Sequence, residues 1–367
     1  MTDAPLIFLG AGASAPFEIP PMKKMVNLFE EELTNKGIDN QIDLWKDAKS
    51  KLENVYGVGN VDIEHMLTFF HFPYVDPASL TPTVIYHYKI AAKDPISVVD
   101  VETANSIVDA LKTFIYNCCN IQKHENIFPT YSTFWKVLSE LVGPKIPDFY
   151  TWPNLKVFTT NYDRCFEIFY NIARNQIRSP REIILGVGEE GRYYNYDYYI
   201  ERDRDSPKLY KLHGSIQRYI TKVGKVRLCE RLMKKSDSID GDEVVEEWMI
   251  WPLMGKYIYQ YPYSELMDQF RETLFERKTW LFVGFSFRDE GINIILKDVN
   301  DRLEDKERRG RNLEKKTLIL IDHSAEEKKH LFEKYGMIQF WPIDGEFGKK
   351  ETFDKLRENA QAHSLFK

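Results

Sequence analysis

Short, continuous apolar runs recur along the chain, and most of them end at a small or polar residue. Runs of this kind are typical of parallel strands that are buried on both faces of a sheet. We therefore predict an α/β fold with a Rossmann-like parallel sheet. The expected strands are 6–9, 156–160, 208–213, 279–283 and 317–321, with 339–341 as one more candidate.

Apolar residues at helical spacing predict helices at 22–31, at 264–277 and from Asp289, which is a favourable N-cap residue. The chain between 36 and 150 is mostly helical in pattern, and it is longer than a strand-to-strand crossover requires. Residues 220–265 show neither periodicity clearly and are expected to be irregular. The predicted domains are a sheet domain at 1–35 plus 150–345, a helical insertion at 36–149 and a C-terminal helical tail at 346–367.

Composition narrows the class of protein. The 367 residues are 43% hydrophobic and 29% charged, as in globular domains. The formal net charge of -6 disfavours direct binding of nucleic acid. The mixed-charge run at 306–311 is read as a solvated helix end rather than a phosphate patch. No apolar stretch approaches the roughly 20 residues that span a bilayer, and no leader precedes the first strand, so we expect a cytoplasmic protein with no membrane contact.

The cysteines argue against a structural metal. The four residues Cys118, Cys119, Cys165 and Cys229 form no CxxC pair, so a tetrathiolate zinc site is unsupported and we expect no metal. They are most simply reduced, buried thiols.

Candidate chemistry gathers where strands end. Asn161 and Asp163 follow the second predicted strand, and His213 with Gly214 follows the third. In an open parallel sheet, ligands bind outside the carboxyl ends of the strands, so these side chains should face one crevice. Asn161 can hold a ribose hydroxyl or a water, and His213 can take a proton near neutral pH. A lone strand-end histidine is more often structural, but three strand-end motifs in one chain favour function.

Two glycine turns complete the pattern. Gly10-Ala11-Gly12-Ala13-Ser14 follows the first strand and precedes a predicted helix, as in a phosphate-binding turn, and the Ser14 hydroxyl could add a donor. Gly284-Phe285-Ser286 repeats this logic at another strand end. The usual acidic ribose partner would be Glu30 or Glu31, which lie in a helical pattern. Asp322 is the better ribose candidate, although a turn aspartate explains it equally well.

In order and context, these strings resemble the motifs of the sirtuin family. The family has a GAGxS loop, a TQNID string, a catalytic LHG and a GxS turn, and the resemblance covers roughly 1–35, 150–218 and 275–325. It implies that Asn161 and His213 are catalytic and that Asp163 holds the nicotinamide carboxamide of NAD. The remaining NAD contacts that it implies are Gly10, Ala11, Gly12, Ser14, Thr160, Gly284, Phe285, Ser286 and Asp322.

The departures from the family point to a subgroup. The CxxC pairs of deacylase sirtuins are missing, and of their GIPDFR-type stretch only the core Ile19-Pro20 remains. The Thr-Thr-Asn-Tyr-Asp string and the helical insertion resemble bacterial sirtuin-like NAD hydrolases of antiphage defence. That resemblance implies an NAD glycohydrolase that passes ADP-ribose to water. Two alternatives stay open: a protein deacylase or ADP-ribosyltransferase, and a catalytically silent nucleotide-binding regulatory protein.

An NAD-depleting enzyme must be gated, because unregulated activity would kill its host. We expect a homo-oligomer and, from the resemblance, a separate trigger such as an ATPase or Argonaute-type partner. The apolar helices of 36–150 could supply the contact surface. So could the aromatic run Tyr193–Tyr199, which is otherwise a surface hairpin.

Overall fold

The computed structural model describes residues 4–74, 101–121, 124–142, 155–177, 183–186, 199, 206–229, 233–234, 236–239, 241–249 and 263–366. The chain forms two compact units. The sheet unit comprises Met1–Glu18, Ile121–Met249 and Ile258–Lys367, and the helical unit comprises Ile19–Asn120 with Ile250–Tyr257. This division differs from the predicted domains: the helix that follows the glycine turn belongs to the helical unit, and the last helix of the predicted insertion belongs to the sheet unit.

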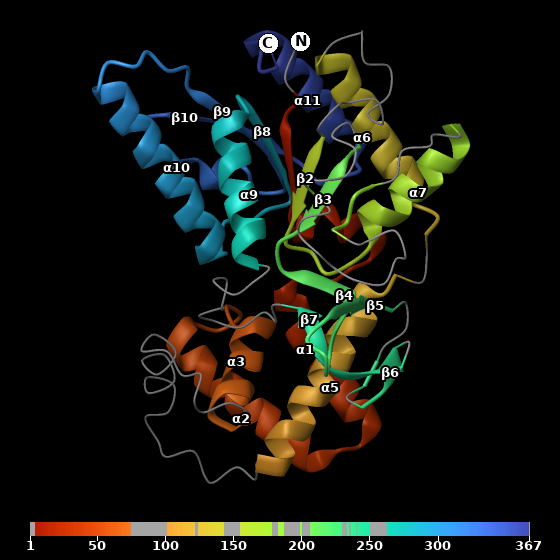
Figure 1. Ribbon diagram of the computed structural model, residues 1–367. Coiled ribbons are helices and arrows are strands. Elements are labelled where there is room, and N and C mark those ends of the chain that lie inside the picture. The colour runs from red at the N-terminus through yellow and green to blue at the C-terminus, as the bar shows by residue number, and fades with distance from the viewer. Residues whose placement is uncertain are drawn as a thin grey trace. The chain divides into compact units, whose positions relative to one another are not determined.

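A six-stranded parallel sheet forms the centre of the sheet unit (Figure 1), as the apolar runs predicted. Its strand order is β10-β9-β8-β1-β2-β3. The interior strands are buried along nearly their whole length, because helices cover both faces. The strands are β1 (Leu6–Leu9), β2 (Lys156–Thr159), β3 (Lys208–Lys211), β8 (Thr279–Val283), β9 (Lys316–Asp322) and β10 (Ile338–Asp344).

The helices of this unit lie on both sides of the sheet. In Figure 1, α9 and α10 lie on one side, and α6, α7 and α11 lie on the other. From β1 the chain order of the strands runs outward in both directions, so the order reverses between β1 and β8. Ligands bind preferentially at such a switch point. The helices are α6 (Ile127–Val142), α7 (Cys165–Ile177), α9 (Tyr263–Glu276), α10 (Glu290–Arg308) and α11 (Lys350–His363).

Stacked aromatic rings fix α9 against the centre of the sheet. The ring of Phe8 on β1 lies 4.6 Å from that of Phe282 on β8 and 5.3 Å from that of Phe270 on α9. Phe158 on β2 lies 5.1 Å from the same Phe270 ring. Three adjacent strands therefore pack on one helix, and the ends of these strands are held in register.

The expectation that 220–265 is irregular is wrong for its first half. A four-stranded antiparallel sheet, ordered β5-β4-β7-β6, follows β3 directly. Its strands bury many polar side chains, which conceals the period of two that marks a strand in sequence. The strands are β4 (Gly214–Thr221), β5 (Val226–Leu228), β6 (Ser238–Ile239) and β7 (Asp242–Met249).

The helical unit is built around large aromatic side chains. Phe29 lies 4.7 Å from the Trp45 ring and 5.3 Å from the Phe114 ring, and all three side chains are buried. Glycine in the left-handed region, Gly37, ends the first of its helices as a C-cap. The described helices are α1 (Met22–Lys36), α2 (Asp39–Tyr56), α3 (Ile63–Tyr74) and α5 (Val101–Cys119).

The remaining sequence predictions concern the helix after the glycine turn, the C-terminal tail, the basic run, membrane spans and the aromatic run. The helix predicted at 22–31 is confirmed as α1, while the glycine turn itself contains a 3-10 turn, Ala11–Ala13, and a second one, Ala15–Phe17, follows it. The predicted tail 346–367 contains the helix α11 but belongs to the sheet unit, and the run 306–311 at the end of α10 is exposed. Among the described residues, no helix combines the length and apolarity that a membrane crossing requires. The aromatic run lies outside the described residues except for Tyr199, which is buried.

Candidate functional site

The two predicted glycine turns lie against each other at the switch point of the sheet. The amide of Gly10 donates to the Val283 carbonyl at 2.8 Å, and the amide of Gly12 donates to the Gly284 carbonyl at 2.9 Å. The amide of Gly284 in turn donates to the Ile321 carbonyl at 2.7 Å. Backbone bonds thus join the loops that follow β1 and β8 to the end of β9.

Close backbone contact explains why these positions are glycine. A Cβ on Gly284 would lie 2.3 Å from the Gly12 Cα, and one on Gly10 would lie 2.6 Å from the Gly284 carbonyl oxygen. Gly284 also has a φ of 62°, in the left-handed region that favours glycine. Sequence reasoning assigned these glycines to a phosphate, whereas the structure shows that the packing of one loop on the other already requires them.

Asn161, Ser14 and Asp163 form one hydrogen-bonded chain beside these loops. The Asn161 side-chain amide donates to the Gly10 carbonyl at 2.8 Å and to the Ser14 hydroxyl at 2.9 Å. The Ser14 hydroxyl donates to Asp163 Oδ2 at 2.7 Å, and Asp163 Oδ1 accepts the backbone amide of Cys165 at 2.9 Å. The loops after β1 and β2, 147 residues apart in sequence, are therefore joined by side chains.

Thr159 prepares this arrangement from the last position of β2. Its hydroxyl donates to the Leu9 carbonyl at 2.8 Å and accepts the backbone amide of Asn161 at 3.0 Å. The Thr159 hydroxyl thereby links the backbone of Asn161 to the end of β1. Thr160, a predicted cofactor contact, lies between them and is partly exposed.

A buried lysine that was not predicted as a site residue makes hydrogen bonds to the loop that carries Asn161 and Asp163. Lys211, the last residue of β3, is 1% exposed and pairs with Glu167 of α7 at 3.0 Å. Its ammonium also donates to the carbonyl oxygens of Tyr162 and Asp163. Lys211 was read only as part of a strand, although a lysine in an otherwise apolar run is a signal of a buried partner.

His213 lies two residues beyond Lys211 and is 4% exposed. Its Nε2 is 3.1 Å from Oδ2 of Asp289, whose side chain is 13% exposed. The separation is that of an ion pair. Asp289 was predicted only as the N-cap of α10, which it also is, because its Oδ1 accepts the Ile292 amide at 3.1 Å.

The predicted cofactor contacts differ in what they can offer a ligand. Ala11 and Ser286 are exposed and Gly12 is partly exposed, so their surfaces are open to a ligand. Phe285 is buried, and its ring lies 4.8 Å from that of Phe8 in the core. Only the backbone of Phe285 can therefore meet a ligand.

Asp322 ends β9 as predicted, and its contacts are those of a turn residue. Its Oδ1 accepts the amide and the hydroxyl of Ser324 at 3.0 and 3.1 Å and pairs with Lys328. These contacts fit the turn interpretation that the sequence left open, and all of them involve the one oxygen. The second oxygen, Oδ2, is in none of these contacts.

With this geometry described, comparison with known families assigns the chain. A family model for the SIR2-like domain matches residues 155–339, which is more than half of the sequence. The chain belongs to the SIR2-like family. The match contains the second, third and fourth of the strand-end motifs, so the resemblance to sirtuins read from them is confirmed at the level of the family and the fold.

Solved structures show partial likeness to this SIR2-like chain. A crystal structure of a Sir2 homolog–NAD complex is 13% identical with a TM-score of 0.41, and the match covers 97% of this chain and 90% of the chain in that structure. A Sir2–p53 peptide–NAD+ structure is 11% identical with a TM-score of 0.38, covering 98% and 93%. No curated protein matches the chain. The family assignment rests on the family model.

Two buried groups close to Asp163, Cys165 and Tyr131, have raised pKa values. Burial, followed by the charge of Asp163, raises the pKa of the Cys165 thiol well above its ordinary value. Burial likewise raises the pKa of Tyr131, with Cys165 and Asp163 adding to it. Both groups stay protonated near neutral pH, so Cys165 is not the thiolate that nucleophilic catalysis requires.

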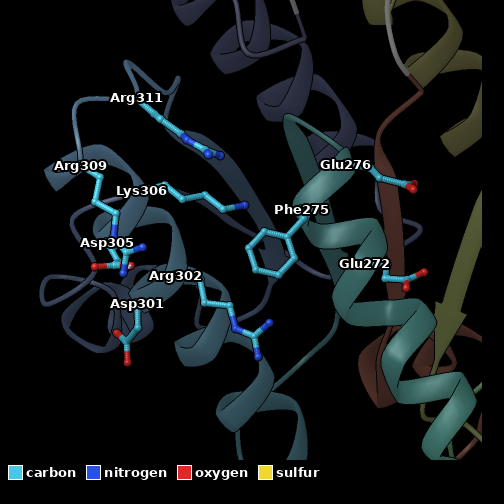
Figure 2. Close-up of a pocket in the computed structure, with 9 residues that line it drawn as sticks. All are labelled: Glu272, Phe275, Glu276, Asp301, Arg302, Asp305, Lys306, Arg309 and Arg311. Atoms are coloured by element: carbon cyan, nitrogen blue, oxygen red, sulfur yellow. Dashed lines mark ion pairs between the residues drawn. The ribbon is translucent and has the colours of Figure 1, made fainter.

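An open hollow of 730 Å³ lies away from these strand ends, between α9 and α10 (Figure 2). Its residues carry charges of both signs, and Arg309 pairs with Asp305 at 2.7 Å. The Lys306 ammonium lies 5.2 Å above the Phe275 ring. The lining carries four acidic and four basic side chains, so the hollow has no excess charge that would favour a charged ligand. Within the described part of the chain, no cluster of three potential metal ligands occurs.

Proposed function

We propose that this SIR2-like protein is an NAD glycohydrolase, which converts NAD and water into nicotinamide and ADP-ribose. The observation that carries the proposal is the chain Asn161–Ser14–Asp163, at strand ends beside the switch point of the sheet. A histidine with a carboxylate partner follows the next strand. An orienting amide and a proton acceptor are the groups that activation of a water or a ribose hydroxyl requires.

The hydrogen bonds give each side chain a role in this proposal. Both bonds of Asn161 use its amide nitrogen, which leaves Oδ1 to accept from a water or a ribose hydroxyl. Water adds its oxygen to the anomeric carbon as the bond to the nicotinamide nitrogen breaks, and the bonding pair returns to that ring. The water proton is released to His213. Asp163 would hold the carboxamide, and the exposed turn residues Ala11 and Ser286 would line the rest of the NAD site.

Solved Sir2 structures are described as complexes with NAD and with a p53 peptide, so deacylation on the same site is the second candidate. The missing CxxC pairs argue against it, and we predict no stoichiometric zinc. Elemental analysis that finds about one zinc per chain would revive the deacylase. A silent regulatory protein is the third candidate, and the complete set Asn161, Asp163 and His213 argues against it.

One assay separates the three candidates. Purified protein is incubated with NAD, alone and with an acyl-lysine peptide, and the products are separated by chromatography. The proposal expects free nicotinamide and ADP-ribose without peptide. Acetyl transfer that requires peptide would establish the deacylase, and unchanged NAD in every condition would leave the regulatory protein.

Single substitutions then assign the reaction to the site. We expect His213→Ala and Asn161→Ala each to lower the rate of nicotinamide release by ~10²–10⁴-fold, because each removes a positioned group. His330→Ala and Asn359→Ala are matched controls, since His330 is exposed, Asn359 is partly exposed, and both side chains bond to backbone of their own helices. Near wild-type turnover in either site variant would refute the assignment.

A role in antiphage defence, in the cytoplasm and as a gated homo-oligomer, completes the proposal. The partner would be an ATPase or Argonaute-type protein, or an infection signal that alters the assembly. Light scattering combined with NAD consumption, with and without the products of neighbouring genes, tests this part. A strict monomer with constant full activity would contradict it.

A further inference from the structure

The turn between β8 and α10 ends at Asp289, whose carboxylate lies beside His213. It begins at Gly284, which is locked against Gly12, and it contains Phe287 at a φ of 57°. A bulky residue in the left-handed region is strained and persists only where its surroundings enforce it. Here the Phe287 ring packs 5.9 Å from that of Phe282 and 4.9 Å from that of Phe332, and its carbonyl accepts the Asn293 side chain at 2.6 Å.

Asp289 comes two residues after this strained position. Its two oxygens have separate partners: Oδ1 accepts the Ile292 amide at 3.1 Å, and Oδ2 lies 3.1 Å from His213 Nε2. Capping occupies only one oxygen, and Ser, Asn or Asp cap a helix about equally well. A neutral residue could therefore serve as the cap, so capping does not explain why this largely buried position, which is 13% exposed, holds a charged side chain.

The pair formed by Asp289 and His213 is largely buried, so the Asp289 charge acts mainly on the His213 ring. His213 is 4% exposed, so the interaction is poorly screened by solvent. A carboxylate beside an imidazole holds the ring in one orientation and favours its protonated form. We propose that Asp289 is the positioning residue of His213: it orients the ring and stabilises the imidazolium that forms when His213 accepts a proton. The catalytic part of this inference rests on the proposed NAD glycohydrolase activity.

Asp289→Asn separates the charge from the cap, since asparagine caps equally well. We expect kcat for nicotinamide release to fall about 10²-fold, with KM within about twofold and an unchanged melting temperature. Asp289→Ala should lower kcat similarly and also lower the melting temperature. Asp301→Asn is the matched control, because it removes a carboxylate from the same helix about 18 Å away. A wild-type kcat in Asp289→Asn would overturn the proposal.

Two readouts distinguish positioning from a merely structural role. In the His213→Ala background, Asp289→Asn should leave the residual rate unchanged, and a further loss would show that Asp289 acts independently. In a pH series of nitrogen NMR spectra of histidine-labelled protein, Asp289→Asn should move the protonation of the His213 ring to lower pH, because the carboxylate charge that stabilises the imidazolium is lost, while Asp301→Asn should not. Unchanged His213 signals would overturn the proposal. Because this spectrum needs no turnover, it decides the positioning role even if the protein fails to cleave NAD.

Discussion

The two halves of the candidate site are held together by different means. In the glycine half, which comprises residues 10–14 and 284–287, backbone lies directly on backbone. In the polar half, which comprises residues 159–163 and 211–213, buried side chains make the connections. The glycines of the first half, Gly10, Gly12 and Gly284, have no side chain to lose, so their substitutions should act on folding. The polar half can be altered one functional group at a time, so there stability and activity can be separated.

The largest effect should follow from Gly284→Ala in the glycine half. The new Cβ would lie 2.3 Å from the Gly12 Cα, and neither backbone can move without disturbing β8 or β1. We expect a loss of about 4 kcal/mol or more of the free energy of unfolding, which is at the upper end for single substitutions. Chemical denaturation monitored by circular dichroism measures it.

Gly310→Ala isolates the part of that effect due to the backbone angle. Gly310 has a φ of 80°, but nothing lies within 4 Å of a Cβ placed on it. Its substitution should cost only about 1 kcal/mol, the penalty of the left-handed region for alanine. If Gly284→Ala and Gly310→Ala lost equal stability, the loss at Gly284 would come from its backbone angle and not from the close packing of the two glycine turns.

In the polar half, Lys211→Met should be the most damaging change to stability. It leaves the Glu167 carboxylate buried without its cation and removes the donor to two loop carbonyls. Breaking a buried pair from one side costs about 3–5 kcal/mol. Thermal melting and denaturant titration of the variant would measure this loss.

The double variant Lys211→Met with Glu167→Leu tests whether the lysine also shapes the site. Replacing both partners by apolar groups is often neutral for stability, so the double variant should regain most of what the single variant loses. The Tyr162 carbonyl keeps its bonds from the Ile216 amide and the Ser215 hydroxyl, but the Asp163 carbonyl still lacks the lysine donor, so NAD cleavage should stay reduced. Full recovery of both stability and activity would show that the pair serves folding only.

The same contrast explains what could be predicted from the sequence. The parallel strands were found because burial on both faces makes them continuous apolar runs, as in Thr279–Val283. Strand β4 was missed because it buries Ser215, Gln217 and Arg218, and polar residues on a buried face remove the alternation. The buried Arg218 donates to the Leu185 carbonyl at 3.0 Å, a partner in another segment that no local pattern reveals.

The site was predictable to the extent that its chemistry lies in short strings. Asn161, Asp163 and His213 follow strands and so stood out at once. The partners that hold them did not, because Lys211 and Asp289 were each explained by a local role, as a strand residue and as a helix cap. Their contacts join residues 44 and 76 positions apart, and only the fold brings these together.

The smallest effect should come from Asp322→Asn, at the end of β9, next to the residue whose carbonyl bonds Gly284. Asparagine can keep a carbonyl oxygen toward Ser324, so the turn contacts of Oδ1 survive, while the charge and the second acceptor oxygen are lost. If Asp322 also accepts from a ribose hydroxyl, KM for NAD should rise about 10-fold with kcat unchanged, as expected for one charge-assisted hydrogen bond. Steady-state kinetics and a melting curve measured together decide between the roles. An unchanged KM with a lowered melting temperature would make Asp322 a turn residue alone, and β9 would then contribute no side chain to the binding of NAD.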